Sequence, residues 1–188
     1  MLRLRGPGSW MFLASLQILF LVNIAEYLYP GYSVSENYIS DLGVGPQPSQ
    51  FIFTITLIIF GLMLLMSAFL LKKEFSRNYL WILVALTGIG ALGVGFFNEN
   101  TGWPHVLFAF IGFTFGSLAP IYAFKVLKPP FSWISVFLGM LGLVSLILLA
   151  TGEDLGMGVG GMERMVFYPG IFWGLGFGAY LMALESKS

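Results

Sequence analysis

The sequence predicts an all-α, polytopic membrane protein, a compact bundle of about six transmembrane helices that forms one domain over residues 1–188. The chain is 57% hydrophobic and its mean hydropathy is +0.86. Only 10% of its residues are charged, whereas a soluble domain carries about 25%. The apolar residues also gather into six runs, each close to the roughly 20 residues that a helix needs to cross a bilayer. So few charges cannot cover the surface of a soluble protein of this size.

The six runs define the expected elements in chain order. The expected spans are residues 10–29, 51–71, 79–97, 105–124, 131–150 and 164–184, with a long loop at 30–50. Each span is expected to be helical, because backbone groups in lipid must pair within their own segment. The first run follows Arg3 and Arg5, as the apolar part of a signal peptide would. It is too long for that and lacks a small-residue cleavage site, so we expect a retained helix.

Basic residues set the expected topology. Eight of the nine fall on one side of the expected spans: Arg3, Arg5, Lys72, Lys73, Arg77, Lys125, Lys128 and Lys187. Only Arg164 falls on the other side. By the positive-inside rule, we expect a multi-pass protein of the cell membrane with both termini cytoplasmic. Most acidic residues lie on the outer side, an asymmetry that the rule does not explain.

Glycine is abundant within the expected spans, with 24 residues in the chain. Gly170, Gly174 and Gly178 form a small-xxx-small ridge on the last span, and Gly112 and Gly116 repeat the spacing on the fourth. This spacing lets helix backbones approach closely. It is compatible with tight packing inside one bundle, which we favour, or with a homodimer through the last span.

The long loop at 30–50 is the first of three polar segments on the expected outer side. It holds Asn37, Ser40 and Asp41 among apolar and aromatic residues. That mixture suits a short helix or a folded lid in the membrane interface. Unstructured loops of this length are uncommon in compact domains and are often functional.

The second segment, residues 98–105, contains Glu99 and ends at His105, the single histidine of the chain. Pro104 suits a first helical turn, so His105 is expected to open the fourth span. A neutral histidine at the outer end of a helix can act as a general base or a ligand. It can equally do no more than hydrogen-bond a loop carbonyl.

The third segment, residues 152–164, is rich in glycine and ends at Glu163 and Arg164. We expect it to approach the last span as a mobile loop, with Glu163 at the helix N-terminus. The guanidinium of Arg164 could hold a lipid phosphate bidentately. The alternative is a structural ion pair of Arg164 with Asp41 or Glu99.

These residues form one set of candidates. The candidate catalytic residues are Asp41, His105 and Glu163, with Asp41 and His105 as an acid–base pair, Arg164 on phosphate and Glu163 orienting it. The candidate substrate-binding residues are Arg164, Ser40, Asn37 and Glu99. Ionisable groups in a membrane domain are costly and usually have a purpose.

Other chemistries are disfavoured by composition. The chain has no cysteine and one histidine, which excludes disulfides, thiolate sites and a three-histidine zinc site. The net charge of zero argues against a nucleic-acid partner. No metal and no cofactor are expected, although the outer carboxylates and His105 could in principle hold a divalent cation.

Two motifs carry a family resemblance. The stretch Asn37-Tyr38-Ile39-Ser40-Asp41-Leu42-Gly43 and the stretch Gly161-Met162-Glu163-Arg164, together with an outer histidine opening the fourth helix, resemble the prokaryotic membrane family known as domain of unknown function 998. The resemblance implies about six helices and no established activity. Ile39-Ser40-Asp41 and His105 are more weakly similar to the DRAM/Sfk-type membrane family, whose members are tied to lipid handling.

Three functions remain open from the sequence, and it does not decide whether the protein is an enzyme. The first is lipid handling, in which a membrane lipid is bound, remodelled or reorganised at a polar site on the extracytoplasmic face. The second is a transporter or channel for a small solute or cation. Against it, the span centres hold almost no ionisable groups, and Glu26 is the deepest. The third is a structural or partner-binding protein in which the polar cluster is a folding clamp.

Overall fold

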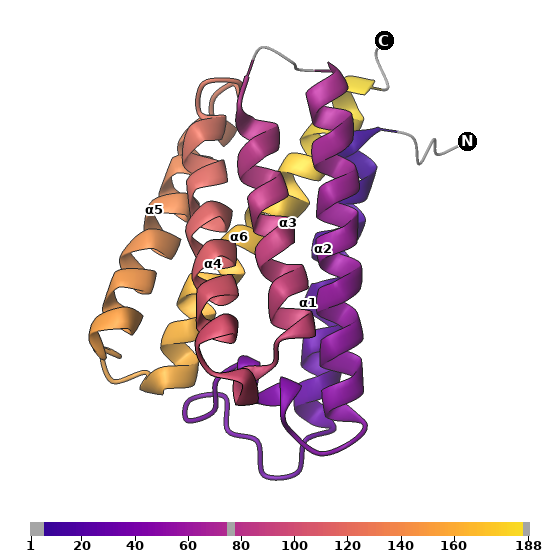
Figure 1. Cartoon of the computed structure of the whole chain (residues 1–188). Helices are drawn as coiled ribbons and strands as arrows, with labels where there is room; N and C mark the ends of the chain where they lie inside the picture. Colours follow the sequence, from indigo (N-terminus) through magenta and orange to yellow (C-terminus); the bar gives the residue numbers. More distant parts are fainter. Residues whose placement is uncertain (1–5, 75–77, 186–188) are drawn as a thin grey trace.

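The structure is a computed structural model that describes residues 6–74 and 78–185 (Figure 1). All of its regular elements are helices: α1 Pro7–Tyr27, α2 Ser49–Glu74, α3 Leu80–Phe96, α4 Trp103–Ala123, α5 Phe131–Thr151 and α6 Gly158–Glu185. Two short 3-10 helices, η1 Ser40–Gly43 and η2 Glu99–Thr101, lie in the connections. The predicted all-α class and the six helices are confirmed in the part of the chain that the structure describes.

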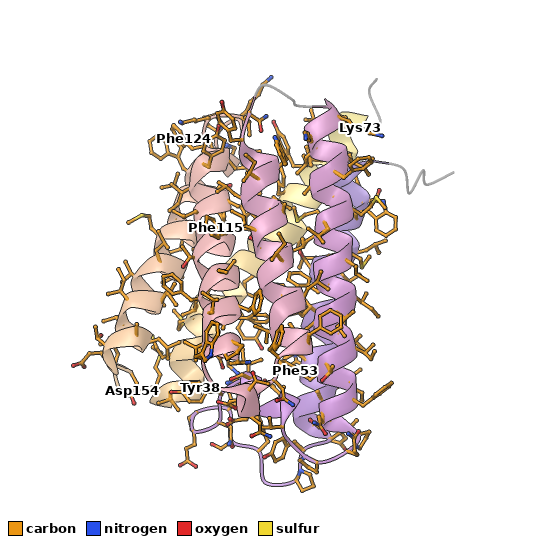
Figure 2. All side chains as sticks on the ribbon, in the orientation of Figure 1. Tyr38, Phe53, Lys73, Phe115, Phe124 and Asp154 are labelled. Atoms are coloured by element: carbon orange, nitrogen blue, oxygen red, sulfur yellow. The ribbon has the colours of Figure 1, made fainter. Side chains whose placement is uncertain are left out.

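Five of the helices are long and apolar enough to cross a membrane, and α3, at 17 residues, is shorter. Large apolar side chains stand exposed around the perimeter of the bundle, as Figure 2 shows. Phe20, Phe51, Phe137 and Ile147 are each more than 60% exposed. A soluble protein would bury such side chains, whereas lipid tails accept them. The chain is therefore a multi-pass membrane protein.

The six helices form a closed ring in chain order, with α6 returning beside α1. Helices α4 and α6 also touch each other directly. As a result α5 packs on the outside of α4 and α6, and the other five helices surround the centre of the bundle (Figure 1).

Small residues bring neighbouring helices into backbone contact. A Cβ added to Gly174 would lie 2.2 Å from Ser15 Oγ, and one on Gly178 would lie 2.6 Å from the backbone nitrogen of Phe12. Gly174 and Gly178 therefore pack against α1 within the chain. The homodimer through the last span stays a prediction.

Lys73 and Asp154 mark the two opposite ends of the bundle (Figure 2). Helix α1 begins and α6 ends at the same end as Lys73, while η1, η2 and Asp154 lie at the opposite end, which we call the outer end (Figures 1 and 2). The basic residues Arg3, Arg5, Arg77 and Lys187 lie outside the described residues. The cytoplasmic location of the termini stays a prediction of the positive-inside rule.

One boundary differs from expectation in a way that matters for the site. Helix α6 begins at Gly158, six residues before the expected start, so the second half of the segment expected to be a mobile loop is helical. Glu163 and Arg164 consequently lie in the second turn of α6 and not at its N-terminus. Tertiary contact explains the difference, because the backbone N–H of Gly160 donates to the carbonyl of Ser35 at 2.9 Å and ties the first turn to the outer loop, residues 28–48.

Candidate functional site

Arg164 is buried where α6 meets α1 and the outer loop, with only 6% of the residue exposed. Its Nη1 donates to the carbonyl oxygens of Val34 and Gly160, each at 2.8 Å, and to that of Asn37 at 3.3 Å. Three backbone carbonyls thus converge on one nitrogen. The guanidinium holds the turn of the outer loop against the first turns of α6.

The other terminal nitrogen, Nη2, forms an ion pair with Glu26 at the end of α1 and donates to Tyr32 Oη at 2.8 Å. The partner of Arg164 is therefore Glu26, and the expectation of Asp41 or Glu99 is wrong. The reason is the ring order of the helices, which sets the last turn of α1 beside α6. The Tyr32 hydroxyl in turn donates a hydrogen bond to the carbonyl of Tyr38 at 2.8 Å. Burial raises the pKa of Tyr32 above its usual value.

Glu163 points to a different partner, the start of η1. Its carboxyl accepts a hydrogen bond from the backbone N–H of Ile39 and another from that of Ser40. Only 6% of Glu163 is exposed. The side chain thereby fixes the position of Ser40 relative to α6.

Asp41 organises the far side of η1. Its Oδ2 accepts hydrogen bonds from Asn37 Nδ2 and from the backbone N–H of Tyr38, both at 3.0 Å. It also hydrogen-bonds the side chain of Glu99 in η2. Burial, followed by this hydrogen bond and the charge of Asp41, raises the pKa of Glu99 to about 7.

His105 lies in the first turn of α4, as predicted, and is 6% exposed. Its Nδ1 lies 2.9 Å from the carbonyl oxygen of Phe97. A carbonyl oxygen can only accept, so Nδ1 carries a hydrogen; in a neutral ring Nε2 is then an acceptor. In the described structure Asp41 and His105 are not hydrogen-bonded to each other.

A cavity of about 120 Å³ runs through the middle of the bundle. It is lined by residues of α1, α2, α3, α4 and α6 and by the start of η1, whereas α5 contributes none. At its outer end lie Ser40, His105 and Glu163, which we call the roof. Below the roof the walls are aliphatic and aromatic apart from a few hydroxyl groups, namely Ser15, Thr87 and Ser117.

The structure therefore divides the predicted site residues into three groups. Ser40, His105 and Glu163 meet at the central cavity, while Asn37, Asp41 and Glu99 form a network on the other side of η1. Arg164 belongs to a third group with two residues that were not predicted, Glu26 and Tyr32. The sequence signal for Glu26 was an acidic residue near the outer end of the first span, which could pair with Arg164, the single basic residue expected on the outer side. Among the described residues no group of three or more acidic or histidine side chains is placed to hold a metal ion.

Comparison with known proteins places the chain in a family. Residues 12–180 match the family model described as "Protein of unknown function (DUF998)". The chain belongs to the DUF998 family. The matched range contains every candidate residue of this DUF998 protein, from Glu26 in α1 to Arg164 in α6. No curated protein and no solved structure matches the chain.

Proposed function

We propose that this DUF998 protein handles a membrane lipid, taking an apolar chain into the central cavity and holding the polar end at the roof. The observation that carries the proposal is the cavity itself, whose polar groups gather at the outer end above apolar walls. A lipid has the same division between a polar end and an apolar chain. Ser40, His105 and Glu163 are the residues that would touch it.

The depth of the cavity supports a chain-shaped ligand. Its lining on α4 extends from His105 to Ala119, which is 14 residues or about 21 Å at 1.5 Å per residue. On α6 it extends from Glu163 to Gly174, which is 11 residues or about 16 Å. These lengths cover about half or more of a hydrocarbon core that is about 30 Å thick. The lining is long along the helices, as an alkyl chain is.

The volume of the cavity sets a condition on binding. An apolar cavity of about 150 Å³ stays dry and binds benzene, so a cavity of about 120 Å³ admits a short hydrocarbon segment. Entry of a full acyl or isoprenoid chain requires the helices to move apart. Several of the lining positions are glycines, which have no side chain to extend into the cavity: Gly90, Gly112, Gly116, Gly170 and Gly174.

The remaining candidates act indirectly in this proposal. Asn37, Asp41 and Glu99 hold η1, and with it Ser40, over the cavity. Arg164 fastens the outer loop and, being absent from the lining, does not serve the phosphate-binding role considered from the sequence. Its contacts favour the third function considered above, a structural or partner-binding protein, because Glu26, Tyr32 and three carbonyls of the same chain take up its terminal N–H groups.

The deciding experiment is mass spectrometry of the lipids that co-purify with the detergent-extracted protein. Ala91 lines the cavity and is 9% exposed, so Ala91→Leu fills the space, whereas Ala179→Leu makes the same change on the exposed face of α6. We expect one lipid class to be enriched over the bulk membrane extract in the wild type and in Ala179→Leu, and lost in Ala91→Leu.

Two results would remove the proposal. One is a wild-type protein whose lipids match the bulk extract, which would favour the structural role. The other is unchanged enrichment in a folded Ala91→Leu protein. Thermal unfolding and gel filtration check that each variant folds, because overpacking a core costs about 1–3 kcal/mol. If Ala91→Leu does not fold, Ala119→Leu tests the same cavity from α4.

A further inference from the structure

The roof of the central cavity differs from the usual recognition site for a phospholipid, because none of its three residues is a lysine or an arginine. In the neutral ring whose Nδ1–H donates to the carbonyl of Phe97, His105 Nε2 is an acceptor. Glu163, whether or not it holds a proton, offers an acceptor oxygen and no positive charge. The Ser40 hydroxyl both donates and accepts.

The nearest cation does not reach this space. Arg164 follows Glu163 in α6 but is not among the cavity residues. Its Nη1 and Nη2 are taken up by Glu26, Tyr32 and three carbonyls. Its Nε–H has no hydrogen-bond partner in the described structure, yet it too is outside the lining.

The acidic side chains around the roof also disfavour an anionic end group. Glu163 is itself part of the roof, Asp41 follows Ser40 in η1, and Glu99 of η2 hydrogen-bonds Asp41. A phosphate or carboxylate end group would therefore enter among acids without a compensating cation. Burying an anion without such a partner is costly.

The membrane makes the polar end decisive for selectivity. Moving an alkyl chain from lipid tails into an apolar cavity gains nothing from the hydrophobic effect, because both surroundings are apolar. The chain therefore contributes packing, and discrimination between lipids falls to the roof.

We infer that the ligand is a lipid alcohol, a long apolar chain ending in an uncharged hydroxyl group, held by His105 Nε2 and the Ser40 hydroxyl. This inference rests on the proposed function and names its substrate class. A hydroxyl donates one hydrogen bond and accepts others, so it satisfies His105 as an acceptor and Ser40 as a donor at once. An ammonium group can donate but cannot accept, and it loses more solvation on burial.

The test uses probes with the same ten-carbon chain and different ends: 1-decanol, decylamine, decanoate, decyl phosphate and decane. Each is added at equal mole fraction to the full-length protein in detergent, and affinity is read from the shift in unfolding temperature with probe concentration. We expect 1-decanol to bind about threefold to tenfold more tightly than decane, the range of one net hydrogen bond. Decanoate and decyl phosphate are expected to bind more weakly than 1-decanol.

Two serine variants locate the effect. Ser40 and Ser117 both line the cavity, one at the roof and one deep in α4. Ser40→Ala is expected to bring the affinity for 1-decanol down toward that for decane, while Ser117→Ala leaves the ratio of the two affinities unchanged. If Ser40→Ala does not fold, His105→Phe is used in its place. It removes the acceptor nitrogen and is expected to lower the affinity for 1-decanol in the same way.

The outcomes separate this inference from the proposed function. Equal binding of all five probes would overturn the alcohol assignment and leave chain binding in place. Tighter binding of decylamine, decanoate or decyl phosphate than of 1-decanol would overturn it as well. If none of the probes binds, the inference and the proposed function both fail.

Discussion

Glu26 and Arg164 form a buried ion pair although 138 positions separate them in the chain. Their side chains are 12% and 8% exposed. The pair joins the last turn of α1 to the second turn of α6 and closes the ring of helices at its outer end. Through Tyr32 and the loop carbonyls, the same guanidinium positions the outer loop, which in turn carries η1 to the roof of the cavity.

Breaking this pair is expected to destabilise the protein strongly. Glu26→Gln leaves a buried guanidinium without its counter-charge, and such changes typically cost about 3–5 kcal/mol. The free energy of unfolding in detergent is the measurement, with the exposed Glu36→Gln as the control. A change of less than about 1 kcal/mol in Glu26→Gln would contradict a clamping role for the pair.

A methyl group at the contact between α6 and the outer loop is also expected to destabilise the fold. In Gly160→Ala the new Cβ would stand 2.0 Å from the carbonyl oxygen of Asn37 and 2.6 Å from that of Val34. Both are backbone atoms, so the loop must shift, at a cost of about 1–3 kcal/mol. Gly112→Ala is the matched control, because its Cβ meets nothing closer than 3.6 Å. Equal unfolding temperatures for the two variants would contradict this packing.

Stability is expected to depend on pH through Glu99. Its folded pKa of about 7 lies above the ordinary value of 4.5, so the folded state holds the proton more tightly than the unfolded state. The resulting stabilisation is complete below about pH 4.5 and is lost as pH rises through about 7. The free energy of unfolding should therefore fall across this interval, and fall less steeply in Glu99→Gln. The exposed Glu153→Gln serves as control, and a slope as steep in Glu99→Gln as in the wild type would refute the prediction.

The tautomer of His105 is a direct spectroscopic prediction. Because Nδ1 donates to the carbonyl of Phe97, the neutral ring should carry its hydrogen on Nδ1. Nitrogen NMR of the protein labelled at histidine reports this without ambiguity, since His105 is the single histidine. A hydrogen found on Nε2 would remove the acceptor from the roof.

The absence of native cysteine makes the topology easy to test. Glu153→Cys places a thiol in the exposed connection at the outer end, and Lys128→Cys places one in the exposed connection between α4 and α5. A membrane-impermeant maleimide is expected to label the first in intact cells and the second only after lysis. The opposite pattern would invert the orientation and put the roof of the cavity on the cytoplasmic side.

The sequence by itself determined the membrane environment, the six helices and the family. These follow from the length and apolarity of continuous segments and from two short motifs, which are local properties of the chain. Local sequence also determined the placement of His105 in the first turn of α4, because a glycine and a proline mark the start of that helix.

The tertiary structure decided which polar residues meet. Glu26 pairs with Arg164, in place of Asp41 or Glu99, because α6 returns beside α1. The first turns of α6 are helical because the outer loop docks on Gly160. The cavity that joins Ser40 and His105 depends on five helices at once. No local pattern encodes these contacts, since each depends on how helices far apart in the chain pack against one another.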